Sequence, residues 1–401
     1  MRTLFRLLIA VVIIVSVAVV LLYAQDARVP GRFVDMFAPE DGTYSALYPR
    51  EAIDGGTSYP LLSATPDQRT IDEASLRAMR AYAADQNSYS LVVIHQGLIQ
   101  TEWYAEDWDG TRLAQSQSMH KSVLPVLIGA AIRDGAIGSA DDAVGTYIEE
   151  WADDPRGRIT LAQMMSMSSG LEEYPFSLNP FSDAFQWLFG SDTRPILLRT
   201  PKVAEPGTEF VYNNINSEIL GLVIEEATGR RYARYLADEL WTPMGGGRAQ
   251  LWLEDDGGKA HSSCCLLSSA HDWARFGLML LGRGAINGNR VVADAYFDRM
   301  ISQSPTSDWY GFQIWLGYSD QLNPRAERLA GAYQRTEPFL AKDTFYTSGF
   351  GAQRVYVVPS KQLVIVRMGL ASGRNPVKET WDNSFLVNTA IRGMQTDGGN
   401  P

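Results

Sequence analysis

The stretch Ser118-Met119-His120-Lys121 leads into an apolar run, SVLPVLIGAAI (residues 122–132), and together they predict a buried helix ending near Asp134-Gly135. Residues three apart on a helix are neighbours, so Ser118 and Lys121 can share a hydrogen bond. A serine hydroxyl becomes nucleophilic when a base removes its proton, and a lysine can be that base where burial keeps it neutral. The alternative is a solvated serine and lysine on a helix surface. The apolar run that follows favours the catalytic interpretation.

Two residues near this pair carry structural expectations only. His120 lies between Ser118 and Lys121 in the sequence and points off their shared face, so we expect a packing or surface residue. Pro125 lacks an amide proton and clashes with the carbonyl four residues earlier, which predicts a local kink in the helix.

A second candidate element is Tyr212-Asn213-Asn214, within PGTEFVYNNINSEILGLVIEEATG (residues 206–229). The Pro206-Gly207 pair predicts a turn, and the apolar residues after Asn214 predict a buried helix. A tyrosine can relay a proton, and a carboxamide offers both a donor and an acceptor. Tyr-x-Asn at a loop-to-helix junction therefore suits acyl transfer. The alternative is a packed tyrosine beside an asparagine that caps the helix.

The third element is TFYTSGFGAQRVYVVPSKQLVIVRMG (residues 344–369). Apolar and β-branched residues on both sides of residues 359–362 predict two antiparallel strands and a hairpin, with Gly349 and Gly351 in the first strand. A glycine inside a strand often marks a close approach of another backbone or a ligand. An amide at that edge can stabilise an oxyanion, which is usually the largest electrostatic contribution in acyl transfer.

In this order, the three elements resemble the serine β-lactamase and penicillin-binding superfamily. The nearest likeness is to its class C-like branch, which includes D-aminopeptidases, esterases and 6-aminohexanoate-dimer hydrolases. The resemblance covers about residues 71–393. Five supporting segments are similar to parts of that branch: ITLAQMMSMSSGL, PGTEFVYNN, LWTPMG, SSAHDWARFGLMLLGRG and YGFQIW.

The resemblance implies a role for each matching residue. Ser118 is the acylated nucleophile, Lys121 its base, and Tyr212 the proton relay that serves the leaving group. Asn214 binds the carbonyl region of the substrate, and the backbone amides of Ser118 and Phe350 form the oxyanion hole. It also implies an antiparallel sheet flanked by helices together with an all-α lobe, an α/β (α+β) fold.

One position departs from the family pattern. Where β-lactamases and carboxypeptidases carry Lys-Thr-Gly or His-Thr-Gly, this chain has Thr347-Ser348-Gly349, followed by Phe350. We expect these four residues to line the substrate site. The missing cation would contact a substrate carboxylate, so its absence favours a neutral ester or amide. Arg354 is an alternative source of positive charge, although a sheet-surface arginine is the simpler interpretation.

Other chemistries lack their motifs. The four histidines form neither H-E-x-x-H nor a Cys/His cluster, so we expect no metal and no cofactor. No G-x-S-x-G nucleophile elbow, dinucleotide-binding G-x-G-x-x-G after a strand, or phosphate-binding P-loop occurs. The net charge of −11 argues against nucleic acid as a partner. Cys264 and Cys265 are adjacent, which predicts two small buried hydrophobes, with a vicinal disulfide as the alternative.

Residues 7–24 form an apolar run interrupted only by Ser16. At about 1.5 Å per residue it spans roughly 27 Å, close to a bilayer core. Leu22-Tyr23-Ala24 is a poor cleavage signal, so we expect an uncleaved membrane anchor, with a long-cored signal peptide as the alternative. A signal anchor normally leaves its short end inside, which places the catalytic domain outside the cytoplasm, in the periplasm. Cleavage would instead release a secreted or periplasmic protein.

The sequence predicts four parts. They are the anchor or signal peptide (1–24), an irregular spacer (25–70), a hydrolase domain (71–395) with a mainly helical lobe at about 125–282, and a tail (396–401). Within the domain we expect a helix over residues 71–84 with Leu76, Met79, Ala81 and Tyr82 on its apolar side, a hairpin of residues 90–95 and 98–104, strands over 311–367 and a last helix near 379–392.

The function expected from sequence is cleavage of an ester or amide through an acyl-serine intermediate. Small-molecule or peptide-like substrates fit this chemistry. The alternatives are a β-lactamase or D-Ala-D-Ala carboxypeptidase, and a non-catalytic penicillin-binding sensor. The sequence leaves the physiological substrate and the oligomeric state open.

Overall fold

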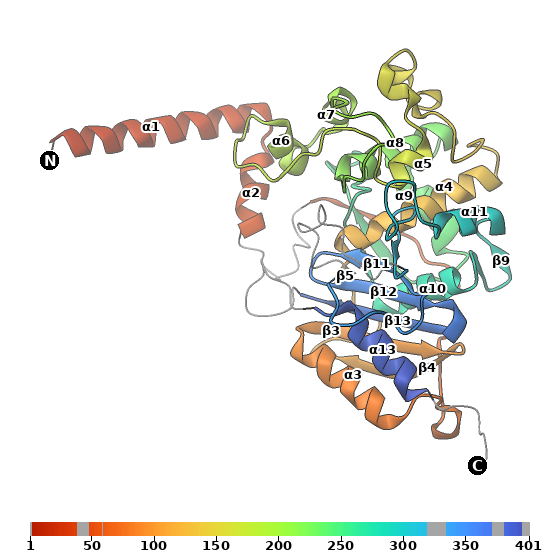
Figure 1. Cartoon of the computed structure of the whole chain (residues 1–401). Coiled ribbons are helices and arrows are strands. Elements are labelled where there is room, and N and C mark those ends of the chain that lie inside the picture. Colours follow the sequence, from red (N-terminus) through yellow and green to blue (C-terminus); the bar gives the residue numbers. More distant parts are fainter. Residues whose placement is uncertain (1, 38–47, 58, 319–333, 371–380, 395–401) are drawn as a thin grey trace.

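The computed structural model describes residues 2–37, 48–57, 59–318, 334–370 and 381–394. These residues form a mixed α/β structure in which the main sheet takes its strands from both ends of the chain and the largely helical middle lies on one side of that sheet (Figure 1). The expected tail at 396–401 and the expected start of the last helix near Glu379 lie outside the described residues.

The main sheet has seven strands in the order β10-β11-β12-β13-β3-β4-β2. All neighbouring pairs are antiparallel except β2 and β4, which are parallel. The antiparallel sheet expected from the resemblance is confirmed. Its strands are β10 (Trp315–Leu316), β11 (Phe345–Gly349), β12 (Gln353–Val358), β13 (Leu363–Gly369), β3 (Ser88–His95), β4 (Leu98–Tyr104) and β2 (Leu62–Ser63).

Helices cover both faces of this sheet. α3 (Glu73–Asp85) and α13 (Asn383–Gly393) lie side by side on one face, and α10 (Ala270–Leu281) packs on the other (Figure 1). In β3, Leu91 and Val93 pack on the α3 side, whereas Val92 and Ile94 belong to the larger core opposite. A strand buried on both faces reads as a continuous apolar run, which is how this stretch appears in the sequence.

The structure corrects two local expectations. α3 buries Leu76 and Met79 as the spacing of its apolar residues predicts, but it buries Ala83 rather than Ala81. Residues 25–70 are not simply irregular, because they contain α2 (Val29–Phe37), β1 (Arg50–Ile53) and β2. β1 and β2 are too short to show a clear periodicity, and they pair with the distant strands β6 (Ala249–Trp252) and β4, whereas α2 packs on α6 (Asp183–Phe189).

A second, four-stranded sheet, which the sequence did not predict, takes two of its strands, β6 and β7, from the middle of the chain. Its order is β1-β6-β7-β5, with β6 (Ala249–Trp252), β7 (Leu266–Ser268) and β5 (Ala114–Gln115). A separate hairpin joins β8 (Ala285–Ile286) and β9 (Asn289–Arg290). The region at 125–282 is therefore mainly, but not wholly, helical. Its strands have two to four residues, too few for an alternating pattern to be recognised.

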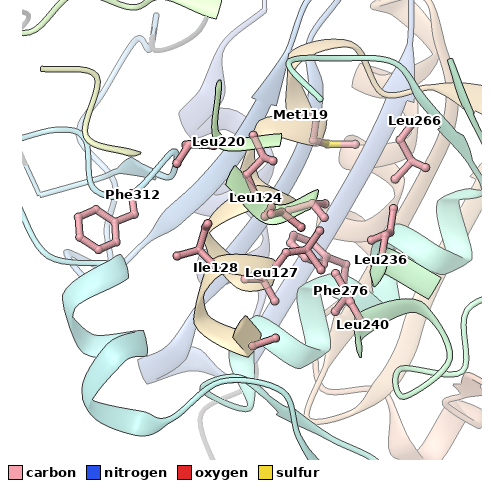
Figure 2. Close-up of a cluster of buried hydrophobic side chains, with 14 of the residues drawn as sticks. Met119, Leu124, Leu127, Ile128, Leu220, Leu236, Leu240, Leu266, Phe276 and Phe312 are labelled. Carbon is pink, nitrogen blue, oxygen red and sulfur yellow. The ribbon is translucent and has the colours of Figure 1, made fainter. Parts of the chain in front are cut away.

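The helical lobe is built around α4 (Val123–Arg133), of which residues 123–131 are all buried. Figure 2 shows Leu124, Leu127 and Ile128 of this helix within one cluster of apolar side chains. The other helices are α5 (Leu161–Met165), α6 (Asp183–Phe189), α7 (Arg194–Arg199), α8 (Asn214–Thr228), α9 (Tyr232–Leu236) and α11 (Asp294–Met300), with the short turns η1 (Pro66–Gln68), η2 (Gln117–Ser122), η3 (Val144–Thr146), η4 (Glu149–Trp151), η5 (Pro155–Arg158), the π-helix η6 (Ala237–Trp241) and η8 (Pro359–Lys361).

The N-terminal helix α1 (Arg2–Gln25) projects away from the rest of the chain (Figure 1). Within residues 5–25, an 18-residue window has a mean hydropathy of 3.2 and none of that window is buried, so the length and composition of this helix suit a membrane span or a signal sequence. The next helix, α2, is attached to the domain. Arg32 is 4% exposed and donates hydrogen bonds to the carbonyl oxygens of Phe189, Gly190 and Glu254.

Candidate active site

Ser118 and Lys121 lie on the 3-10 turn η2, immediately before α4. Lys121 Nζ is 3.1 Å from Ser118 Oγ, so the structure joins the two residues that the sequence paired. Contrary to the prediction, Pro125 does not have to kink the helix. α4 begins only at Val123, which puts Pro125 in the first helical turn, where backbone amides have no partner within the helix.

Burial sets the chemical state of Lys121. Its side chain is among the largest that are fully buried, and its ammonium also donates to the carbonyl oxygen of Ser263. Burial lowers the pKa of Lys121 from 10.5 to about 7, and the nearby Glu218 carboxylate opposes that shift. A substantial fraction of Lys121 is therefore neutral near pH 7, as a base for Ser118 requires.

Tyr212 lies at the end of the loop that enters α8, as its motif predicts. Lys121 Nζ is 5.4 Å from the centroid of its ring. Burial raises the pKa of Tyr212 to about 12, while a hydrogen bond to Ser118 and the charge of Arg354 act in the opposite direction. The phenol thus keeps its proton at neutral pH and is in contact with Ser118.

The two asparagines after Tyr212 have different environments. Asn213 caps α8, since its side chain accepts from the Ile215 amide at 2.9 Å and donates to the carbonyl oxygens of Leu171 and Glu172. Asn214 is the first residue of the helix and is partly exposed. The capping interpretation is confirmed for Asn213, and the substrate role of Asn214 stays a prediction.

Gly349 provides the close approach predicted for this strand. A Cβ at this position would lie 2.3 Å from Ser116 O and 3.0 Å from the Met119 amide nitrogen, so β11 packs directly on η2. Phe350 follows at the end of the strand and is 56% exposed. Gly351, expected in the same strand, instead lies in the turn before β12 with φ of 77°. A glycine tolerates this conformation without steric cost.

The structure does not support substrate contact by the Thr347 side chain. Thr347 is fully buried, and its hydroxyl accepts from the Val355 amide of β12 at 3.0 Å. Ser348 is 6% exposed. Arg354, expected at the sheet surface, is also fully buried and donates to Gly349 O at 3.1 Å and Asn383 Oδ1 at 2.8 Å. It is buried because α13, which carries Asn383, covers its face of the sheet.

Sequence reasoning missed the segment of residues 259–265, here called the strap. Its carbonyl oxygens at Ser263 and Cys264 accept hydrogen bonds from Lys121 and, at 2.7 Å, from His120 Nδ1. His120 is buried and its other ring nitrogen is 3.0 Å from the Tyr232 hydroxyl, so the packing alternative is confirmed for it. The strap ends in a Cys264–Cys265 disulfide, which corrects the expectation of two unbonded cysteines.

Glu218 was also missed, although the sequence carried a signal. It is the single acidic residue in the apolar run 215–224, on a helix with an otherwise buried face. A carboxylate at such a position is rarely buried without a partner. The partner, Lys259, lies 41 residues away and follows from the tertiary structure alone.

A two-sided sheet with a serine and a lysine at the start of a buried helix defines the β-lactamase and penicillin-binding class of folds. The family model of that description, Beta-lactamase, matches residues 77–387. The chain belongs to this family. The match lies within the domain expected at 71–395.

Individual relatives share about a quarter of their residues with this chain over the matched segments. A 6-aminohexanoate-dimer hydrolase of Paenarthrobacter ureafaciens is 26% identical over 46% of this chain and 50% of its own. A protein of Salmonella agona, provisionally named D-alanyl-D-alanine carboxypeptidase, is 25% identical over 47% of this chain and 50% of its own. The chain thus matches about half the length of these relatives.

Solved structures show the same fold. A Bacillus anthracis protein, provisionally named 6-aminohexanoate-dimer hydrolase, has a TM-score of 0.68 at 19% identity, covering 88% of this chain and 93% of its own. A family VIII carboxylesterase has a TM-score of 0.59 at 16% identity, covering 85% of this chain and 99% of its own. At these identities the likeness establishes the fold and not the substrate.

Proposed function

We propose that this protein is a serine hydrolase that cleaves an ester or amide through an acyl-serine intermediate. The observation that carries the proposal is the contact of 3.1 Å between Ser118 Oγ and Nζ of a fully buried lysine whose pKa is lowered to about 7. A solvated surface pair would have neither the burial nor the lowered pKa. The family membership and the names of the relatives support the same chemistry.

Each residue has a defined step in this mechanism. Neutral Lys121 accepts the proton of Ser118 as its oxygen attacks the substrate carbonyl carbon. The amides of Ser118 and Phe350 bind the negative charge that develops on the carbonyl oxygen. Tyr212 gives its proton to the leaving alcohol or amine and is reprotonated through Lys121. A water molecule then attacks the acyl carbon, its proton passes by way of Tyr212 and Lys121 to Ser118 Oγ, and the carboxylic acid is released with the serine hydroxyl restored.

This mechanism predicts how rate depends on pH. Because Lys121 acts as a base only after it loses its proton, kcat/KM should rise with pH and level off above about 7. The same lowered pKa means that the unfolded chain binds one more proton than the folded one between about 7 and 10.5, so this residue's contribution to stability increases with pH there. Initial rates with a neutral ester between pH 5 and 9 check the profile. A flat profile would contradict the assignment of Lys121.

The substrate is proposed to be neutral at the position next to the scissile bond. β11 carries Thr347 instead of a cation. The guanidinium of Arg354 is buried and donates its hydrogen bonds to Gly349 and Asn383. The β-lactamase and carboxypeptidase alternative depended on Arg354 reaching a carboxylate, and this placement does not favour it. Thr347→Lys would have to bury an ammonium group, so we expect it to destabilise the sheet rather than to change specificity.

One experiment separates the three functions. The purified protein is incubated with a fluorophosphonate, a short neutral ester or a penicillin, followed by intact mass and product analysis. We expect a fluorophosphonate adduct on Ser118, ester turnover and slow reaction with penicillin. Efficient penicillin turnover would favour a β-lactamase, and a lasting penicillin adduct without ester turnover a sensor. Ser116→Ala, at a neighbouring buried serine, is the matched control for the site of labelling.

We further propose that α1 anchors the chain in a membrane with the catalytic domain outside the cytoplasm. Residues 5–25 have the length and apolarity for a span, and no proposed catalytic residue precedes Ser118. Full-length protein should therefore start at Met1 and stay in the membrane after a carbonate wash. A mature N-terminus between residues 25 and 32 would instead establish cleavage of a signal peptide.

The attachment of α2 predicts where the chain can be cut. Deletion of residues 1–24 should yield a soluble, active domain, because the contacts of Arg32 to Phe189, Gly190 and Glu254 are retained. Arg32→Ala should lower the free energy of unfolding by about 2–3 kcal/mol, since it removes hydrogen bonds from a buried charged group. Denaturant unfolding measures this, with the exposed Arg77→Ala as control. An unchanged midpoint for Arg32→Ala would show that α2 is only a spacer.

A further inference from the structure

A buried pair of charges lies beside the proposed site, and the mechanism does not use it. Glu218 on α8 is fully buried, and Lys259 Nζ lies 2.6 Å from Glu218 Oε2 and 3.1 Å from Glu254 Oε1. Removing two charges from water is expensive, and such a pair often adds no net stability. Its position relative to Lys121 indicates another use.

The contacts of Glu218 lead directly to the base. Glu218 Oε1 accepts from the Ser263 amide at 3.0 Å, and the carbonyl oxygen of the same residue accepts from Lys121 Nζ. The hydroxyl of Ser262 donates to Ser217 O at 3.0 Å and to Glu218 Oε2 at 3.4 Å. The carboxylate of Glu218 on α8 thus holds Ser263, and Ser263 in turn holds Lys121.

The strap needs such support at this point. Ser262 and Ser263 lie in a turn between the isolated bridge at Ala260 and the start of β7, so no strand ladder includes them. On the other side, His120 holds the carbonyl of Cys264. Neighbouring carbonyls of the strap therefore meet neighbouring side chains of η2, and a shift of the strap would move the acceptor of Lys121.

We infer that Glu218 and Lys259 are positioning residues, which act through Ser263 to hold the amine of Lys121 against Ser118. Lys259 compensates the buried carboxylate, and Glu218 orients the strap. The inference rests on the proposed function in that Lys121 must be the base for it to affect catalysis. Glu218 adds a second effect, because its negative charge favours the protonated form of Lys121 and so opposes the effect of burial.

The charged and titratable groups around Lys121 come from five parts of the chain. Glu218 belongs to α8, and Tyr212 to the loop before it. His120 is next to Lys121 on η2, and Lys259 and His261 are on the strap. Burial lowers the pKa of each of the two histidines to about 4. Arg354 of β12 acts on Tyr212. Both histidines are therefore neutral above pH 5, so the charge near Lys121 that can be removed without touching the base itself is that of Glu218 and Lys259.

Glu218→Gln tests the inference because it keeps the shape of the side chain and removes its charge. We expect kcat for a neutral ester to fall roughly tenfold to a hundredfold with little change in KM, as a misplaced base would produce. The acid limb of the pH profile should move to lower pH, because loss of the carboxylate lowers the pKa of Lys121. Glu226→Gln is the matched control, since Glu226 lies on the same helix but is exposed and pairs with Arg194 at 2.9 Å.

A measurement that needs no turnover separates this inference from the proposed function. The chain has six lysines, so NMR of the full-length protein in detergent with ¹³Cε-labelled lysine, assigned with Lys121→Met, follows the titration of Lys121 directly. A lower pKa in Glu218→Gln supports the inference even if no ester is cleaved. Ester turnover with kcat, acid limb and titration of Glu218→Gln all unchanged would overturn it.

The double variant Glu218→Gln/Lys259→Gln tests whether the two residues act together. In Glu218→Gln alone, Lys259 keeps Glu254 as a partner at 3.1 Å, and in the double variant Glu254 keeps its hydrogen bonds from Thr193. If the two residues act as one unit, the double variant should lose no more activity than Glu218→Gln alone, whereas independent roles would give additive losses. A double variant that folds and has wild-type kcat would overturn the inference.

Discussion

Ser118→Ala should abolish both fluorophosphonate labelling and ester hydrolysis. The hydroxyl is the only atom proposed to form the covalent bond, so we expect a loss of at least about 10³-fold in kcat. Lys121→Ala should cause a comparable loss, because without the amine nothing at 3.1 Å accepts the serine proton. Initial rates with a short ester, together with intact mass after labelling, measure both effects.

The pair should behave as a unit. The double variant Ser118→Ala/Lys121→Ala is expected to be no less active than either single variant, since each already stops acylation. Lys121→Arg should also fail, because a guanidinium does not deprotonate in a protein. Lys202→Ala, at a surface lysine paired with Glu205, is the control. More than about a tenth of wild-type activity in Ser118→Ala, a loss below roughly 1.4 kcal/mol, would rule out the mechanism.

Gly349→Ala should produce the second large effect. The new Cβ would lie 2.3 Å from Ser116 O, a backbone atom that cannot rotate away, so β11 and η2 must separate. That separation moves the amide of Phe350 relative to Ser118 and weakens the proposed oxyanion hole. Loss of one donor to an oxyanion costs about 10²- to 10³-fold in kcat, and we expect a decrease of this size.

Two comparisons make the Gly349 prediction specific. Gly31→Ala introduces a methyl group with no heavy atom within 4 Å, so activity should be unchanged. Thermal unfolding of Gly349→Ala separates a general loss of folding from a local change at the site. A folded Gly349→Ala with wild-type kcat would show that the contact between β11 and η2 does not shape the oxyanion hole.

The local patterns in the sequence predicted most of the elements around the site. The apolar run after Lys121 indicated a buried helix, and α4 ends at Arg133 as expected. Alternation and turn residues gave the hairpin of β3 and β4 and the pair β12 and β13. The Ser-x-x-Lys spacing predicted the contact between Ser118 and Lys121, because residues three apart meet on either an α- or a 3-10 helix.

Side-chain exposure on the strand was predicted less well. Thr347 and Arg354 were expected to face substrate or solvent, but both are buried. Periodicity assigns residues to alternate faces of a strand, but it does not say which faces other elements cover. α13 begins 34 residues after β11 ends. Only the packing of α13 on the sheet shows that Arg354 is buried and donates a hydrogen bond to Gly349 O.

The sequence by itself determined which serine, lysine and tyrosine are proposed as nucleophile, base and proton relay, and the order of the elements that carry them, because each depends on residues close together in the chain. The tertiary structure alone decided the state of Lys121. Its lowered pKa depends on burial among distant segments, and its position depends on Ser263, Glu218 and Lys259, which lie 97 to 142 residues away. Desolvation and Coulomb interactions act through space, so no local pattern in the sequence records them.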